Sequence, residues 1–366
     1  MAGAPQVVQF DESSRLDDLA REWLALAGRL EGTSYFQTPD WVLSWWETLA
    51  GRPRTRAVAW RGPSGRLEAL VLLTRDRVAL HPRLPLRVAV YANAGSGVGA
   101  ADHCGWLVPA AWREPVAAWL AETLGSTGLL LRGVPDADEP PLPPGARVIG
   151  RTACPRTTVP SPGDDVGRSH GFTRQLARFT RRIEREGVRF AWLSGDALDE
   201  RVLRALFELH TRSRSRHGDA TSFAVEQLDL HRRLVRRSGA RRGPQAVVAE
   251  RDGVVAGVLY GFAWKDTFAA YQWGWGGEWD RHSMGSVLAY QALRLAPERG
   301  IATFDFLRGA EPYKYRFGAV DRWDRTWMVP RGLAGALLAA RYGARDLVHG
   351  LRANHPAARR PAYSRS

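Results

Sequence analysis

The side chains best suited to proton transfer gather around one short predicted strand. Asp305 stands between two phenylalanines, so on a strand its side chain points to the face opposite theirs. A buried carboxylate needs a partner, and Arg308 and Lys314 are the nearby cations. Glu311 and Tyr313 follow in a stretch that we expect to be a loop. The spacing brings acid, base and cation within one small region.

Two interpretations fit these side chains. In the chemical one, Glu311 or Asp305 accepts a proton and Tyr313 protonates a leaving group. Lys314 then binds a phosphate or a carboxylate. In the structural one, the same residues form an ion-pair network that ties the strand to the loop. Lys265 and Lys314 are the only lysines among 52 basic residues, so a lysine where arginine is the usual cation favours a specific role for Lys314.

His210 is a further candidate for proton transfer, because it falls within a predicted helix. A histidine there either orients a substrate and accepts a proton or packs in the core. Three aromatic residues, Tyr271, Trp273 and Trp275, share one face of a predicted strand. They either line a pocket for an acyl group or a sugar, or pack against a helix.

A second candidate site lies where a predicted helix over 284–296 begins. Arg281, Ser283, Gly285 and Ser286 surround its first turn. The N–H groups there have no acceptor within the helix and lie at the positive end of its dipole, and Gly285 lets a phosphate approach the backbone. Arg281 would add a charge-assisted hydrogen bond. An ordinary helix capped by Ser283 fits the same residues.

The elements that must position these residues divide the chain into two predicted domains. Residues 1–150 show the patterns of a mixed α/β domain, and a connector rich in proline, glycine and aspartate is expected over 134–163, with a short strand open at 147–149. The second domain, 168–330, is followed by a helix and a loose tail over 331–366. In the second domain the pattern predicts helices over 172–187, 197–216, 225–238 and 284–296, and strands over 188–193, 245–251, 254–264, 268–275 and 301–307.

The net charge of +14 is concentrated in one part of the chain. Residues 168–242 hold 18 arginines against 9 acidic residues, whereas residues 1–133 are close to neutral. A general bias towards arginine does not explain a local excess. The segment is either a basic face for the phosphates of a coenzyme, a nucleotide sugar or a tRNA, or a set of solvated helical faces.

Composition excludes several classes of protein. A hydrophobic fraction of 45% excludes wholesale disorder, and no apolar run approaches the roughly 20 residues of a membrane span. The first residues show no secretory signal, so we expect a cytoplasmic protein with reduced thiols at Cys104 and Cys154. Nine histidines without an H-x-x-x-H spacing, and cysteines without C-x-x-C, predict no metal site.

From about residue 36 to 330 the chain resembles the CelD-like acetyltransferase family of the GNAT superfamily, which is related to the Fem-type aminoacyl transferases. The most specific piece is DFLRGAEPYKYRFG, which begins at Asp305. FQTPDWVLSWWETL, RQLARFTRRIEREGVRF and FELHTRSRSRHG also resemble the family. One departure is Ser283-Met284-Gly285, where members of the family often carry Ser-Pro-Gly.

The resemblance implies two GNAT-like lobes of α/β (α+β) class, with mixed sheets flanked by helices and a degenerate first lobe. It implies transfer of an acyl group from acyl-CoA, with acetyl-CoA as the first choice, to an amine of a sugar or small metabolite by direct attack. The candidate catalytic residues are then Glu311, Asp305, Tyr313, Lys314 and His210. The candidates for binding the coenzyme are Arg281, Ser283, Gly285, Ser286 and Arg308.

Two other functions stay open. The Fem relatives imply a transferase that takes its group from an aminoacyl-tRNA, and the basic segment over 168–242 fits that donor. The other is a non-catalytic scaffold in a polysaccharide or metabolite assembly. We expect no DNA partner, and the sequence does not predict the oligomeric state.

Overall fold

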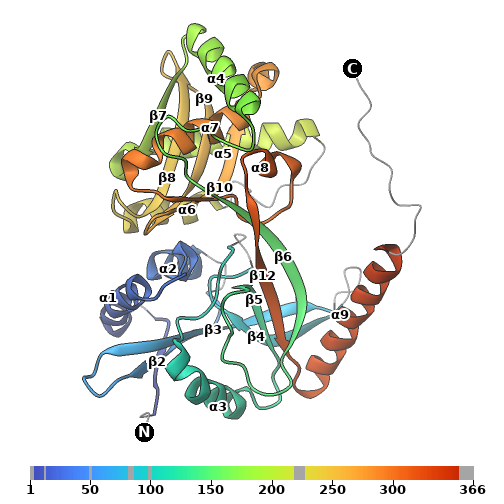
Figure 1. Cartoon of the computed structure of the whole chain (residues 1–366). Coiled ribbons are helices and arrows are strands. Elements are labelled where there is room, and N and C mark those ends of the chain that lie inside the picture. The colour runs from blue at the N-terminus through green and yellow to red at the C-terminus, as the bar shows by residue number, and fades with distance from the viewer. Residues whose placement is uncertain are drawn as a thin grey trace.

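The protein consists of two lobes that share one mixed sheet (Figure 1). This computed structural model describes residues 4–11, 14–48, 52–80, 86–97, 101–217 and 227–353. The first lobe contains β1 (Gln6–Gln9), α1 (Ser14–Arg29), the 3-10 turn η1 (Tyr35–Gln37), α2 (Pro39–Thr48), β2 (Thr55–Arg61), β3 (Leu67–Ala79), β4 (Arg87–Asn93), α3 (Arg113–Leu124) and β5 (Leu129–Pro135).

The second lobe follows a long strand, β6 (Arg147–Thr158). It contains α4 (His170–Arg185), β7 (Arg189–Ser194), α5 (Glu200–His217), α6 (Leu228–Arg237), β8 (Gly243–Arg251), β9 (Val254–Trp264), β10 (Thr267–Trp275), the 3-10 turn η5 (Gly277–His282), α7 (Met284–Leu295), β11 (Thr303–Asp305) and α8 (Pro312–Arg316). β12 (Val320–Val329) and α9 (Gly332–Ala353) come last.

Within the described residues, twelve strands form one continuous sheet in the order β1-β2-β3-β4-β5-β12-β6-β11-β10-β9-β8-β7. β12 lies between β5 and β6, so the chain returns to the first lobe after completing the second. Figure 1 shows β6 and β12 running side by side from one lobe to the other. The predicted α/β class with a mixed sheet is confirmed, and the two lobes are halves of a single sheet.

The connector over 134–163 contains a strand where one was open at 147–149, but this strand, β6, is longer and occupies Arg147–Thr158. Most of its residues are exposed or half-buried, so the strand lacks the apolar alternation that marks strands in a sequence. Hydrogen bonding to β12 on one side and β11 on the other holds it in the sheet. β12 is equally polar, and the sequence did not predict it.

The other elements of the second lobe largely follow the sequence pattern. The predicted helices begin and end within a few residues of α4, α5, α6 and α7, although 225–226 lie outside the described residues. The strand predicted over 301–307 is shorter, Thr303–Asp305, because the chain turns at Leu307 with a positive φ. Residues 354–366 of the predicted tail also lie outside the described part.

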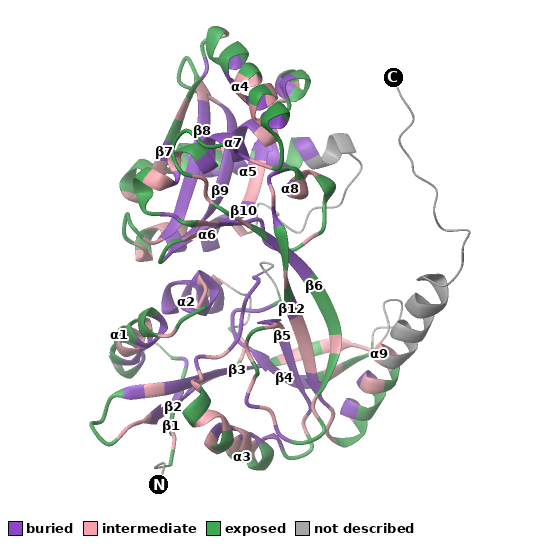
Figure 2. Ribbon diagram, in the orientation of Figure 1, coloured by how far each residue is buried: buried purple, intermediate pink, exposed green. Residues whose placement is uncertain are grey.

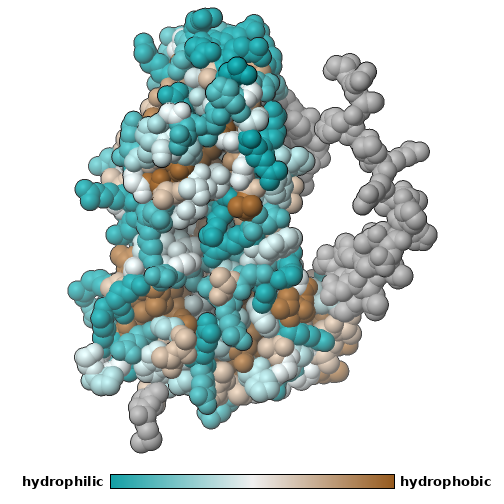
Figure 3. Space-filling view, viewed as in Figure 1, coloured by the Kyte–Doolittle hydropathy of each residue, from teal (hydrophilic) through white to brown (hydrophobic). Residues whose placement is uncertain are grey.

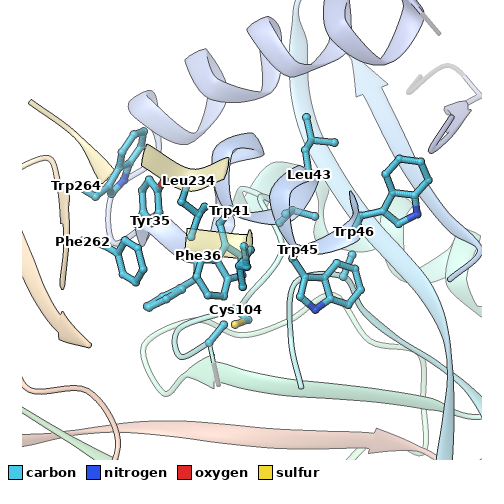
Figure 4. Close-up of a cluster of buried hydrophobic side chains, with 14 of the residues drawn as sticks. Tyr35, Phe36, Trp41, Leu43, Trp45, Trp46, Cys104, Leu234, Phe262 and Trp264 are labelled. Carbon is cyan, nitrogen blue, oxygen red and sulfur yellow. The ribbon is translucent and has the colours of Figure 1, made fainter. Parts of the chain in front are cut away.

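The two lobes meet through an aromatic cluster (Figure 4). Tyr35 stacks on Phe262 of β9 with ring centroids 4.9 Å apart, and Trp41 meets the same ring edge-on at 5.5 Å. Phe36 also packs against Phe262. Figure 2 shows this region as buried as the interior of either lobe. Burial of rings this large makes the first lobe part of the core that covers one face of the second.

The opposite face of the second lobe is covered by α4 and α7. Phe172, Leu176 and Ile183 form a buried stripe along α4. Val287 and Leu288 of α7 pack in the same cluster. The central strands are therefore enclosed between α4 and α7 on one face and α5, α6 and the first lobe on the other.

Candidate active site

Two parallel neighbours in the second lobe, β10 and β11, pair over only three residues. Thr267–Ala269 pairs with Thr303–Asp305, and β10 then continues to Trp275 with no strand beside it on that side among those described. The pairing of β10 with β9 also shifts register between Ala270 and Gln272. Beyond Ala269, β10 therefore has an edge without a partner strand among the described residues, and the carbonyl of Trp273 there is held by His210.

Tyr313 lies where these two strands separate. Its ring meets Trp273 of β10 edge-on at 5.9 Å and Phe306, the residue after β11, at 6.2 Å. On the other side of Trp273, the Nδ1 atom of His210 is 3.1 Å from the carbonyl oxygen of that residue. This bond assigns a proton to Nδ1. Two of the predicted catalytic residues thus lie against one tryptophan.

A close approach of helix and strand brings His210 there. A Cβ on Gly274 would come within 2.4 Å of the backbone nitrogen of His210, so only glycine lets α5 lie this near β10. His210 itself is buried, with 3% of its surface exposed. The sequence pattern favoured a packed histidine over a catalytic one, and the burial of His210 agrees with packing.

Asp305 belongs to a buried ion triad that links β11, β12 and a loop of the first lobe. His103 lies between two carboxylates, with Nε2 3.1 Å from Asp305 and Nδ1 2.8 Å from Asp324 of β12. Burial alone would lower the pKa of His103, but the two carboxylates outweigh it and raise that pKa to about 10. Burial likewise opposes ionisation of Asp305, yet His103 and the N–H of Leu307 lower its pKa. His103 is therefore protonated at neutral pH and Asp305 is ionised.

Arg308 is bound by the residue before that histidine. Its backbone N–H and its Nε atom both donate to the carboxylate of Asp102, at 3.0 and 2.5 Å, and Nη2 donates to the carbonyl of Ala101. Burial raises the pKa of Asp102, and the guanidinium works against that shift. Arg308 is thus held by the first lobe, in the turn after β11.

Lys314 closes the same turn from the other side. Its Nζ atom donates to the carbonyl oxygens of Leu307, Arg308 and Gly309, at 3.2, 2.8 and 2.9 Å, and pairs with Glu311 at 2.9 Å. An ammonium has three hydrogens, and three backbone acceptors use them. The contacts of Lys314 match the structural interpretation, and its predicted binding of a phosphate stays untested.

Glu311 is more exposed than the rest of the network. Its side chain is 54% exposed, and it precedes α8, a five-residue helix where a loop was expected. Its carboxylate reaches only as far as Lys314 among the ion pairs of the described residues. Of the predicted bases it is the one in open contact with solvent.

The start of α7 differs from the sequence expectation in its details. Ser283 is the N-cap residue of α7, as the sequence predicts, but it has a positive φ of 51° and its side chain makes no capping hydrogen bond in the described structure. The Nη2 atom of Arg281 lies 3.1 Å from Glu186. Trp275 lies over Gly285, because a Cβ there would come within 2.9 Å of the indole ring.

This arrangement partly fits a phosphate group. The N–H groups at the beginning of α7 have no acceptors within the helix, whereas that of Ser286 is turned to Ser283 at 2.9 Å. The side chain of Arg281 is 64% exposed and can leave Glu186 for a stronger anion. Gly285 is required by the packing of Trp275, so the glycine is not by itself a sign of phosphate binding.

The sequence missed three of the groups that hold the turn: Asp102, His103 and Asp324. Asp102 and His103 lie in a loop of the first lobe, and Asp324 lies on β12. His103 and Asp324 are more than 200 residues apart in the chain. The only signal was a short polar pair, Asp102-His103, within an otherwise apolar stretch. Their partners depend on the return of β12 to the first lobe, which no local pattern encodes.

His103 also brings together the groups nearest to a metal site in the described structure. Ligand atoms of His103, Cys154 and Asp324 all lie within 4.8 Å of one another. The spacing argument from sequence could not have found this group, because the residues are distant in the chain. Both ring nitrogens of His103 already contact carboxylates, so the ion triad accounts for the cluster.

Comparison with known proteins adds a family match and a shared fold. Residues 170–315 match the model of an acetyltransferase (GNAT) domain. The crystal structure of FemX is 11% identical, with a TM-score of 0.60 over 88% of this chain and 96% of that one. The C-terminal domain of a protein described as a lysylphosphatidylglycerol synthetase, from Agrobacterium fabrum, is 13% identical, with a TM-score of 0.54 over 90% of this chain and 96% of that domain.

Two further findings limit what these likenesses say. No curated protein is significantly similar to this sequence. In the described part of the chain, every helix is too short or too polar to cross a bilayer. Identities this low establish the shared fold, and the acyl donor and the acceptor have to be argued from the site.

Proposed function

Because the chain is a GNAT-fold acyltransferase, we propose that it moves an acyl group from acyl-CoA, acetyl-CoA first of all, to an amine of a sugar or small metabolite. The observation that supports this best is the separation of β10 and β11 inside the segment that matches the GNAT model. The open edge of β10 leads through η5 to the start of α7. One continuous path thus offers backbone groups to a thioester arm and a helix start to phosphates.

In this proposal the start of α7 binds the pyrophosphate of the coenzyme. Arg281, Ser283, Gly285 and Ser286 are the residues that would hold it, with Arg281 exchanging Glu186 for the phosphate. The thioester supplies an activated acyl group, so the protein needs only to position an amine, take its proton and stabilise the leaving thiolate. Arg308 is too firmly bound to Asp102 to be our first choice as a phosphate ligand.

The contacts rank the predicted acid–base groups. Tyr313 lies at the point where the strands separate and is our candidate for protonating the thiolate. Asp305 is a poor base, because its lowered pKa and its bond to His103 keep it ionised and occupied. Glu311 and His210 are the better candidates, and Lys314 then serves to hold the turn rather than to bind substrate.

The experiment combines calorimetric binding of acetyl-CoA with a thiol-release assay on a panel of amino sugars, amino acids and polyamines. We expect acetyl-CoA to bind and at least one amine to release CoA. Tyr313→Phe, Glu311→Gln and His210→Gln are then compared, with Tyr315→Phe, one residue beyond Lys314, as the matched control. Loss of turnover in Tyr315→Phe alone, or no acetyl-CoA binding at all, contradicts the proposal.

A transferase that uses aminoacyl-tRNA is the second candidate, and one observation favours it. Helix α4 exposes a row of arginines on the surface of the second lobe, and Figure 3 shows that end of the molecule as hydrophilic. The exposed residues are Arg174, Arg178, Arg181, Arg182 and Arg185. Binding of tRNA that weakens steeply with salt, together with no binding of acetyl-CoA, would favour this function. No turnover with either donor would favour the scaffold.

The domain boundaries are part of the same proposal. We assign residues 1–150 to a degenerate GNAT-like lobe, 168–330 to the acyltransferase lobe and 331–366 to a C-terminal helix and tail. The position of β12 between β5 and β6 qualifies this division, because that strand is paired entirely with strands outside 168–330.

A further inference from the structure

A pocket between the lobes has no role in the function proposed above. It has a volume of about 210 Å³ and lies against the paired ends of β10 and β11, on the face of the sheet that the first lobe covers. Segment 32–36 forms one wall, and Phe262 and Trp264 of β9 form an apolar one. The volume is below the range of about 300 Å³ and more that drug-sized ligands occupy, so the pocket suits a small molecule.

Cations predominate among the charged residues that line this pocket. His103, Arg156, Lys265 and Arg322 carry positive charge, against the carboxylates of Asp266 and Asp305. Counting Asp324 behind His103 still leaves four positive groups against three negative ones. The carboxylate of Asp305 is bonded to His103 at 3.1 Å, and Arg322 acts on it only at longer range.

Arg156 and Arg322 are placed to act together. In the sheet ladder Arg156 lies directly opposite Asp305 of β11, and on its other side opposite Val320 of β12. Arg322 is two residues further along β12, so the two arginines are diagonal neighbours on one face of the sheet. Long side chains reach each other at that spacing, and like charges there repel unless an anion separates them.

Among the described residues neither guanidinium makes a hydrogen bond or an ion pair, although the charge of Arg322 acts at longer range on the carboxylates of Asp138 and Asp305. Arg322 is half-buried and Arg156 is exposed at the pocket mouth. A pair of guanidinium groups on a rigid sheet is the arrangement that binds carboxylate or phosphate with two or more charge-assisted hydrogen bonds.

The pocket also ends at the point where chemistry would take place. Ala269, the last residue of β10 that pairs with β11, lines it, and the two strands separate beyond that residue. A molecule anchored between the arginines would extend along Phe262 and Trp264 towards the point where β10 and β11 separate. The acyl group of a donor bound along the open edge of β10 would approach the same point from the other side.

We propose that this pocket binds a carboxylate or phosphate group of the acceptor, and that Arg156 and Arg322 are its ligands. The assignment to the acceptor rests on the proposed acyl transfer, and the anion site itself does not. The acceptor is then a small amine that also bears an acidic group, as an amino acid or an amino-sugar phosphate does.

The test is calorimetric titration of the full chain with two probes, inorganic phosphate and succinate, each with and without saturating acetyl-CoA. The double variant Arg156→Gln/Arg322→Gln removes both guanidinium groups, and each single variant is measured beside it. Arg147→Gln is the matched control, because Arg147 lies on the same strand, β6, and outside the pocket. Melting temperatures of all variants check that they fold.

We expect at least one probe to bind the parent chain, and its Kd to rise at least tenfold in the double variant and less than twofold in Arg147→Gln. Equal affinity in the double variant, or no binding of either probe to the parent chain, overturns the anion site. If acetyl-CoA displaces the probe, the pocket is part of the donor site, and the assignment to the acceptor is overturned. If acetyl-CoA fails to bind while the probe does, the proposed function fails and the anion site stands.

Discussion

The turn after β11 and the start of α7 both contain a residue other than glycine with a positive φ, yet the protein holds them in opposite ways. Leu307 has a φ of 55°. Its N–H donates to Asp305 and its carbonyl accepts from Lys314, while the N–H of the next residue donates to Asp102. Ser283, at 51°, lies on the surface beside an exposed ion pair of Arg281. The comparison indicates a fixed end, the turn after β11, where we expect the reaction to take place. It also indicates an adaptable end, the start of α7, where we expect a large donor to bind and leave.

The largest effect is expected where the fixed end is tied to the first lobe. His103→Ala leaves two buried carboxylates without a cation, which should lower the free energy of unfolding by about 3–5 kcal/mol. Urea denaturation measures it. His170→Ala, which removes an exposed histidine paired with Asp165, is the control and should change stability by less than about 0.5 kcal/mol. Equal effects of the two variants would remove the distinction between the two ends.

The two lysines of the chain provide a second test of the same contrast. Lys314→Met leaves three carbonyl oxygens of the turn without their donor and should cost about 2–3 kcal/mol. Lys265→Met also removes a bond to a carbonyl, that of Leu30, but from an exposed position, and should cost less than about 1 kcal/mol. Thermal denaturation of both variants compares them, and a larger cost for Lys265→Met would contradict this account.

The pH dependence of stability should report the charge on His103. Its pKa is about 10 in the folded chain against an ordinary value of 6.5, so its proton stabilises the fold. That stabilisation is complete below about pH 6.5 and is lost as the pH rises through about 10. Melting temperatures from pH 8 to 11 should therefore fall, and they should fall less in His103→Gln. The nearby thiols of Cys104 and Cys154 do not interfere, because burial raises their pKa values.

The smallest effect on stability is expected at the adaptable end. Arg281→Gln should change the free energy of unfolding by less than about 0.5 kcal/mol, since the side chain is exposed. The same variant should weaken binding of acetyl-CoA by about tenfold, the loss of one charge-assisted hydrogen bond. Arg294→Gln, at the other end of α7, is the control and should leave the affinity unchanged. A stability loss comparable to that of His103→Ala would show that both ends are fixed.

How much of this the sequence could predict depends on where the partners of each residue lie. The helices and strands of 172–296 follow from apolar periodicity, because their cores are built from neighbouring turns and alternate residues. The motif from Asp305 to Lys314 was recognised as a unit, and Lys314 contacts carbonyls only five to seven residues away. Contacts between residues close in the chain could therefore be predicted from the sequence.

The rest depends on contacts across the sheet. Nothing near Asp305 in sequence indicates that its cation is His103, 202 residues earlier, rather than Arg308 or Lys314. Trp275 likewise lies over Gly285 only because η5 reverses the chain between them. The sequence indicated a glycine for phosphate binding, whereas the structure requires it for packing. Polar strands such as β6 and β12 are stabilised by pairing on both sides, and pairing leaves no mark on hydropathy.

The place of β12 has a consequence for the order in which the chain acquires its structure. During synthesis, residues 129–135 and 147–158 leave the ribosome well before residues 320–329, the strand that fills the space between them. Until then β5 presents an open edge to the surrounding solution, and Asp324 is not yet there to meet His103. The first lobe therefore completes its folding only after the second has been made, so truncation before residue 320 should yield an aggregation-prone fragment rather than a smaller stable protein.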